Sequence, residues 1–195
     1  IPLAVVANDF SASELQAVEN AIGTWNDHFE NVKGFSLYLS GSSTLAQVGS
    51  GGTRLTSATA CSQAVIGSNG FTNKIMIYKT SSGWTFGSSV IALTSLCPVT
   101  TANSTYRMFV SAVMEINFVD YFRSGKPLPD LESVVLHELG HMLGLDHSCN
   151  GSGCTNVSDD YRNAVMYPAL GFDGNNGRQK RVLQANDQGR ANCLY

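Results

Sequence analysis

The order of apolar and polar positions predicts a chain that contains both strands and helices. An apolar run at Leu3–Ala7 is typical of a short buried strand. Ser11 and Ser13 then offer overlapping capping boxes, and apolar side chains recur at helical spacing until Gly34 ends the segment. We therefore predict an amphipathic helix packed on a sheet, with an apolar face formed by Leu15, Val18, Ile22, Trp25 and Phe29.

Four later segments are predicted to be strands because they are apolar, alternating or β-branched: Phe35–Leu39, Lys74–Lys79, Val90–Leu96 and Met108–Phe118. Residues 40–60 are rich in Gly, Ser and Thr, which predicts a loop or an irregular strand. Asp130 follows Pro127 and Pro129 and is a suitable N-cap for a second helix. A final helix is expected from Lys180 to about Asn192.

Length and composition are those of one globular domain over residues 1–195, with 43% hydrophobic and 14% charged residues. A net charge of −3, without a large basic cluster, argues against nucleic acid as a partner, and no apolar run is long enough to span a membrane. The chain has no initiator Met and no signal peptide, so we expect a mature or trimmed form. We expect a monomer that is secreted, either extracellular or periplasmic.

The cysteines favour disulfides over a second metal site, because no C-x-x-C pair is present. We expect one bridge between Cys61 and Cys97 and a second among the three later cysteines. Two bridges would leave one thiol unpaired. Spacing leaves the second pairing open among Cys149, Cys154 and Cys193.

The most informative stretch is Val134–Ser148, which reads VVLHELGHMLGLDHS. His137 and His141 are four residues apart, so on a helix both imidazoles point to one side. Gly144 can adopt the left-handed backbone that ends a helix, which would let the chain turn back and deliver His147. Three neutral imidazole nitrogens with a fourth position open are typical of one catalytic zinc ion.

Glu138 adjoins the first of these histidines without having to be a ligand. We expect it to act as general base and then general acid in hydrolysis by a zinc-activated water. The alternatives are that Glu138 is only a solvated helix residue, or that the fold binds zinc and has lost catalysis. His28 has no second ligand at a useful spacing and is interpreted as structural or exposed.

These residues resemble a known family. The spacing H-E-x-x-H-x-x-G-x-x-H is the metzincin signature, and Ser148 after the third histidine is similar to the matrixin branch. The segment Ala164–Pro168 (AVMYP) resembles the matrixin Met-turn ALMYP. The C-terminus resembles the matrixin closing pattern, so that the similarity spans nearly the whole chain, through Leu183, Asn186, Asp187, Leu194 and Tyr195.

The resemblance implies an α+β metzincin fold. Residues 1–144 would hold a twisted, mixed five-stranded sheet with the N-terminal helix and the zinc-binding helix. Residues 145–195 would form a small C-terminal subdomain with the Met-turn and the final helix. Met166 would lie beneath the metal as an apolar floor, with the metal held by His137, His141 and His147.

The resemblance also implies where substrate binds. A peptide would add in antiparallel orientation to the sheet edge formed by Val90, Ile91, Ala92, Leu93, Thr94 and Ser95. The wall of the pocket beyond the scissile bond would be Tyr167, Pro168, Ala169 and Leu170. We expect an apolar substrate side chain on that leaving side.

Several positions depart from the matrixin pattern. Asn186 replaces the first Asp of the closing pair, which puts the family's salt link to a mature N-terminus in doubt, and Arg190 occupies the usual Gly position. The loop Cys149–Asn163 is longer than the family's connection, and the loop that holds a structural zinc and calcium in vertebrate matrixins is missing. Asp173–Gly177 resembles part of a calcium loop, but a plain turn is favoured. The bare domain resembles microbial matrixin-like proteases more than vertebrate collagenases.

The first functional hypothesis is therefore a secreted zinc endopeptidase that hydrolyses proteins or peptides. A second is a zinc-stabilised binding module with the protease fold and no turnover. A third is a peptidase of another class, either an exopeptidase or a peptidoglycan-directed hydrolase.

Overall fold

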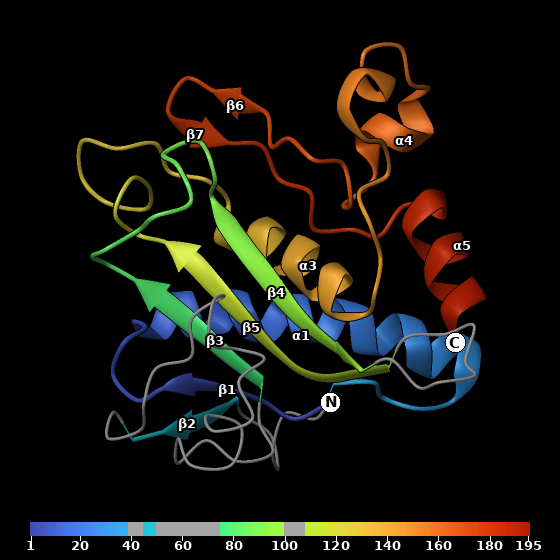
Figure 1. The fold of residues 1–195 in the computed structure, drawn as a ribbon, viewed down its shortest axis with the longest axis horizontal. Helices are drawn as coiled ribbons and strands as arrows, with labels where there is room; N and C mark the ends of the chain where they lie inside the picture. Colours follow the sequence, from blue (N-terminus) through green and yellow to red (C-terminus); the bar gives the residue numbers. More distant parts are fainter. Residues whose placement is uncertain (39–44, 50–74, 100–107) are drawn as a thin grey trace.

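The computed structural model describes residues 1–38, 45–49, 75–99 and 108–195, which form a five-stranded sheet with two long helices on one face (Figure 1). The strands lie in the order β2-β1-β3-β5-β4, and only β4 runs antiparallel to its neighbour. The predicted mixed five-stranded sheet is thus confirmed. Its strands are β1 (Leu3–Val6), β2 (Ala46–Val48), β3 (Ile75–Thr80), β4 (Ala92–Val99) and β5 (Met108–Asn117).

Helix α1 (Ala12–Lys33) begins and ends as predicted. Ser11 caps it through a capping box with Glu14, and Gly34 ends it in the left-handed conformation with φ 77°. Its apolar face is buried against the sheet and includes Val18, Ala21, Ile22, Trp25 and Phe29.

The prediction of a strand at Phe35–Leu39 is wrong. Residues 35–38 form bends and irregular backbone, and Leu39 lies outside the described residues. The reason is a side chain of α1. Asn26 Oδ1 accepts the backbone N–H groups of Leu37 (3.1 Å) and Tyr38 (2.8 Å), and Asn26 Nδ2 donates to the Tyr38 carbonyl (2.8 Å). These bonds take up backbone groups that a neighbouring strand would need. The second strand is instead β2, inside the segment predicted as a loop or irregular strand.

The later strands agree with prediction apart from their ends. Strand β3 is shifted by one residue along the chain, and β5 ends one residue early. Strand β4 starts two residues later than expected and continues past a register shift between Cys97 and Pro98. Proline donates no N–H to a sheet ladder, so an edge strand tolerates it best. Within the described residues, β4 has no neighbour on its outer side.

Helix α3 (Leu131–Met142) carries the first two histidines of the motif and packs on α1 and β4. Asp130 is its N-cap, as predicted. Two bulky side chains from the N-terminal half donate hydrogen bonds to its carbonyl groups. Trp25 Nε1 donates to the Leu136 carbonyl at 3.0 Å, and the Tyr38 hydroxyl donates to the Leu139 carbonyl at 2.6 Å. These buried contacts fix α3 relative to α1.

The C-terminal part contains short elements and one longer helix: η1 (Gly151–Cys154), α4 (Asp159–Asn163), β6 (Phe172–Asp173), β7 (Asn176–Gly177) and α5 (Ala185–Leu194). Strands β6 and β7 make a hairpin, so Asp173–Gly177 forms the turn that was predicted. Helix α5 starts later than predicted because the preceding residues are anchored to α3. Lys180 N donates to Ser133 Oγ at 2.7 Å, and the Arg181 guanidinium pairs with Asp130.

A disulfide joins Cys149 to Cys154, and Cys97 is also disulfide-bonded. Cys193 is free and exposed, and Cys61, the expected partner of Cys97, lies outside the described residues. One bridge among the three later cysteines is therefore confirmed. Within the described ranges, none of the helices is both long and apolar enough to cross a membrane.

The cap of α3 gives a first prediction. Asp130 Oδ1 accepts Ser133 N at 3.0 Å, and Arg181 Nη2 lies 2.5 Å from Asp130 Oδ2. Asp130→Ala is expected to lower the free energy of unfolding by about 2 kcal/mol. Ser11→Ala, which removes the exposed cap of α1, should cost about 1 kcal/mol. Both losses are measured by denaturant titration. Equal or smaller losses in the Asp130 variant would contradict this account.

The same carboxylate predicts a pH dependence. Burial would raise the pKa of Asp130, but hydrogen bonds from Arg181 and Ser133 and the Arg181 charge hold it below the ordinary 3.8. A carboxyl with a depressed pKa contributes stability above its unfolded pKa and loses it as pH falls through the folded pKa. The difference in unfolding free energy between wild type and Asp130→Ala should therefore shrink below pH 3.8.

Candidate metal centre and substrate cleft

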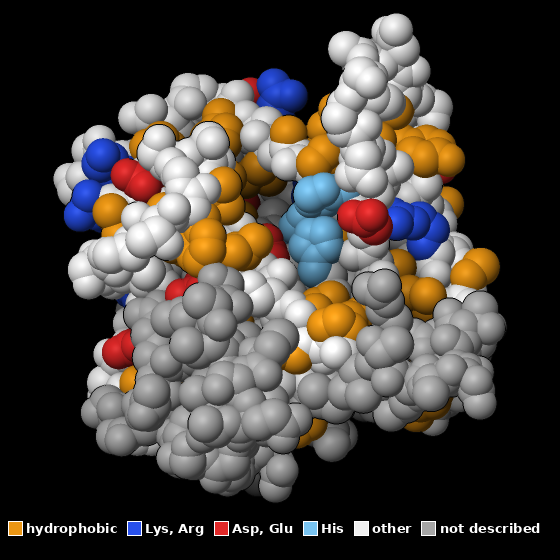
Figure 2. Space-filling view, viewed as in Figure 1, with side chains coloured by type: hydrophobic (Ala, Val, Ile, Leu, Met, Phe, Trp, Pro, Cys, Tyr) orange, Lys and Arg blue, Asp and Glu red, His pale blue; other side chains and the backbone are white. Residues whose placement is uncertain are grey.

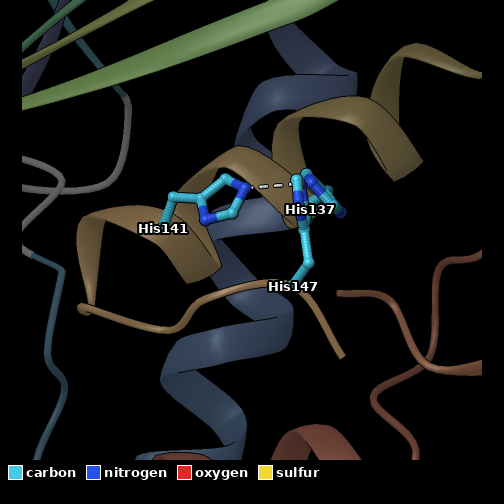
Figure 3. A group of neighbouring side chains, drawn as sticks. All are labelled: His137, His141 and His147. Carbon is cyan, nitrogen blue, oxygen red and sulfur yellow. Dashed lines mark hydrogen bonds between the residues drawn. The ribbon is translucent and has the colours of Figure 1, made fainter. Parts of the chain in front are cut away.

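The three histidines of the motif converge on one point (Figure 3). His137 and His141 project from the same side of α3, and their Nε2 atoms are 3.1 Å apart. After α3 the chain turns at Gly144 with φ 90°, a conformation that side-chain-bearing residues rarely adopt, and returns with His147. One ligand atom from each of the three side chains lies within 4.8 Å of the others. The predicted cluster is thus formed by a helix and the turn that follows it.

Backbone carbonyls fix the orientation of two of these rings. His137 Nδ1 lies 2.7 Å from the Val165 carbonyl, and His141 Nδ1 lies 2.8 Å from the Leu145 carbonyl. A carbonyl only accepts, so each Nδ1 carries the proton and each Nε2 keeps its lone pair. Two lone pairs 3.1 Å apart repel each other unless a cation lies between them. This donor set fits a metal ion.

The electrostatics also favour neutral imidazoles. Burial lowers the pKa of His137 to about 4, outweighing the hydrogen bond to Val165. The pKa of His141 is lowered by burial and by the charge of His137, although Glu138 opposes the shift. At neutral pH both rings are therefore unprotonated at Nε2, which is the form that binds zinc.

Glu138 is a residue of α3, and it contacts Thr94 of the edge strand β4. Its side chain is buried, and its Oε2 has no hydrogen-bond partner among the described residues. Burial raises the pKa of Glu138, while the charge on His141 and hydrogen bonds from Thr94 work against this shift. Thr94 Oγ1 also donates to the Glu138 carbonyl at 3.2 Å. A carboxyl with an unpaired oxygen and a raised pKa is suited to accept and return a proton.

Met166, the predicted apolar floor of the site, is fully buried. A Cβ at Gly140 would lie 2.3 Å from Met166 Sδ, so only glycine lets this methionine pack directly against α3. Its position beneath the metal stays a prediction.

Asp187 of α5 holds the Met-turn in place. Its carboxylate accepts the backbone N–H groups of Val165 (2.8 Å), Met166 (3.0 Å) and Gln184 (2.9 Å). The Val165 carbonyl in turn accepts from His137 Nδ1. The Val165 carbonyl and the Met166 N–H belong to the same peptide group. Asp187 therefore helps to position the carbonyl that accepts from His137. The sequence had suggested Asp187 only as part of a C-terminal pattern, without this contact.

The neighbouring Asn186 behaves differently. Its Oδ1 is buried without a partner among the described residues, and the amino group of Ile1 donates to the Leu37 carbonyl at 2.6 Å. These contacts agree with the doubt raised about a salt link at this position.

A cleft of about 820 Å³ passes the three histidines, with Glu138 on its wall. Figure 2 shows the histidine side chains beside a hollow in this face of the molecule. Residues of the predicted substrate strand line this cleft, and so do all four residues of the predicted pocket wall. Ser95 does not line the cleft. The lining residues among those predicted are Val90, Ile91, Ala92, Leu93, Thr94, Tyr167, Pro168, Ala169 and Leu170.

Other lining residues were not predicted. Tyr121, Ser133, Phe172 and Lys180 come from separate segments that tertiary folding brings to the cleft. Periodicity and motif spacing report on local structure, so neither carries a signal for these contacts.

A family model described as Matrixin, peptidase M10, matches residues 64–195. No curated protein matches the chain.

The hydrogen-bonded link from Asp187 to His137 predicts the effect of a small change. Asp187→Asn would turn an amide NH₂ toward backbone N–H donors, so the turn and the His137 ring should shift. We expect zinc affinity to fall about 10–100-fold in a chelator competition titration. Asp173→Asn, in the exposed hairpin, is the matched control and should leave zinc affinity unchanged. Equal affinities in both variants would contradict the proposed link.

Proposed function

The chain belongs to the matrixin family, peptidase M10, whose members are zinc metalloendopeptidases, and on that premise we propose that it is a secreted zinc endopeptidase. The family match covers residues 64–195, which is more than half of the chain. The observation that carries the proposal is the cluster of three imidazoles, with ligand atoms within 4.8 Å of one another, beside the buried carboxyl of Glu138.

We propose that His137, His141 and His147 would hold one zinc ion at the wall of the cleft. The support is chemical: His137 and His141 offer neutral nitrogens whose orientation is set by carbonyl acceptors, and His147 converges on the same point. Bound there, zinc would supply Lewis acidity, lowering the pKa of a water and polarising the scissile carbonyl.

Glu138 would do the proton transfer. Its unpaired Oε2 accepts a proton from the attacking water, and the same carboxyl then donates it to the leaving amine. Burial raises the pKa of this carboxyl above its ordinary value, which favours acceptance of a proton. Contacts with Thr94 hold the carboxyl between the helix and the edge strand.

The substrate would bind as an added strand. Strand β4 is at the end of the described sheet order, and an open edge offers backbone groups to an extended peptide. Ala92, Leu93 and Thr94 of this strand line the cleft, and Tyr167–Leu170 line it as well. We propose that the peptide runs antiparallel to β4 and that the side chain after the scissile bond enters beside Tyr167–Leu170.

Two observations support the proposed cellular location. Matrixins are generally secreted, and the chain has a disulfide between Cys149 and Cys154 and a second disulfide-bonded cysteine at Cys97. Disulfides persist in oxidising compartments. We propose an extracellular or periplasmic monomer that acts on proteins or peptides.

The test measures zinc content and cleavage of a mixed peptide library for wild type, Glu138→Ala and His147→Ala. Wild type and Glu138→Ala should each bind zinc at a ratio near one, and His147→Ala should lose it to a weak chelator. Wild type should cut internal peptide bonds, and Glu138→Ala should reduce kcat/KM by about 10³-fold or more.

The competing hypotheses give other results. Zinc binding without wild-type cleavage would favour a binding module. Removal of single terminal residues would favour an exopeptidase, and cleavage of peptidoglycan alone would favour a hydrolase of that polymer. Absence of zinc after reconstitution would overturn the proposal at its first step.

A further inference from the structure

The leaving side of the cleft contains a lysine that the proposed mechanism does not use. Lys180 lines the cleft from the segment before α5, where its backbone N–H is anchored to Ser133 Oγ. Its Nζ donates to the carbonyls of Arg162 (2.7 Å) and Ala164 (3.0 Å). The same Nζ lies 4.8 Å from the centre of the Tyr167 ring. This ammonium therefore lies beside the wall that would receive the substrate side chain.

The charge of Lys180 is not neutralised by a carboxylate at close range. Lys79 and Arg178 each lie 2.8 Å from a carboxylate oxygen, whereas within the described part of the chain Lys180 has no carboxylate within 4.0 Å. The nearby carboxylate of Asp187 already accepts three backbone N–H groups. An ammonium has three donors, and two carbonyls account for two of those on Lys180.

The positive charge acts on the cleft. Burial lowers the pKa of Lys180, and the charge of Asp187 opposes this shift. Lys180 lines the cleft and its Nζ lies over the Tyr167 ring, so the charge lies at the wall of the site. Apolar and aromatic residues also line the cleft, together with Ser133 and the carboxyl groups of Glu138 and Asp146. The apolar and aromatic ones include Tyr121, Val134, Val165, Tyr167, Leu170 and Phe172.

We propose that Lys180 determines specificity for the residue after the scissile bond, favouring side chains that end in a carboxylate or amide oxygen and excluding those that end in a cation. The inference rests on the proposed endopeptidase function and replaces the expectation of an apolar side chain at this position. A Glu or Gln side chain would place its methylene groups on the apolar wall and its oxygen near the ammonium. A Lys side chain would bring two positive charges together in a partly buried site, where repulsion is stronger than in water.

Lys180 also ties together the carbonyls of Arg162 and Ala164, next to the Met-turn. Its replacement could therefore lower activity for structural reasons alone. The informative quantity is a ratio between two substrates measured on the same variant, because the active fraction of enzyme cancels in that ratio.

The experiment uses peptides that differ only in the residue after the scissile bond: Leu, Gln, Glu or Lys. Wild type should show a kcat/KM for the Glu peptide about tenfold or more above that for the Lys peptide. Lys180→Met keeps an unbranched stem without the charge and should bring this ratio close to one. Arg178→Met removes one positive charge from the exposed hairpin outside the cleft lining, and it should keep the wild-type ratio.

A second readout avoids turnover. Binding of the same labelled peptides to Glu138→Ala, with and without Lys180→Met, is followed by fluorescence anisotropy. The Glu peptide should bind more tightly than the Lys peptide when Lys180 is present, and the two Kd values should become similar in the double variant. Equal kcat/KM values for the Glu and Lys peptides in wild type, or a Glu-to-Lys ratio that Lys180→Met leaves unchanged, would overturn the inference. Either result would leave the proposed endopeptidase function intact. A retained Kd ratio without any wild-type cleavage would support the pocket and overturn the endopeptidase. Loss of both cleavage and binding preference would overturn both proposals.

Discussion

The structure depends on keeping His137 and His141 neutral and on aiming three imidazoles at one point. A protonated imidazole would be costly at this position, because the rings crowd one another and burial disfavours the charged form. The structure meets this constraint with backbone carbonyls. Val165 and Leu145 each accept from an Nδ1, so the Nε2 atoms of His137 and His141 face inward with their lone pairs free. The convergence thus follows from which ring nitrogen each carbonyl engages.

The two halves of the molecule meet on α3. From the N-terminal half, Trp25 and Tyr38 donate to carbonyls of this helix and fix its position over the sheet. From the C-terminal half, Asp187 holds the turn that contains Met166, and Gly140 admits that methionine against the helix. Helix α3 is therefore held from both sides, which allows the histidines to keep their geometry while one side of the cluster remains open to the cleft.

The sequence predicted the features that depend on local spacing. The i, i+4 histidines, the turn at Gly144 and the capping box of α1 are encoded within a few residues, and all appear as predicted. The features that failed depend on distant side chains. Asn26 takes the backbone groups that would have made a strand after α1, and anchoring of Lys180 to α3 delays the start of α5. No pattern within a single segment reports such contacts.

The most direct test of the central claim is X-ray absorption spectroscopy of the zinc-loaded protein. The account predicts three nitrogen ligands of imidazole type and one oxygen, at about 2.0–2.1 Å from the metal. His147→Ala should remove one imidazole from this shell or prevent loading. A shell containing sulfur, or one unchanged in the His147 variant, would contradict the assignment of the three histidines as the metal site.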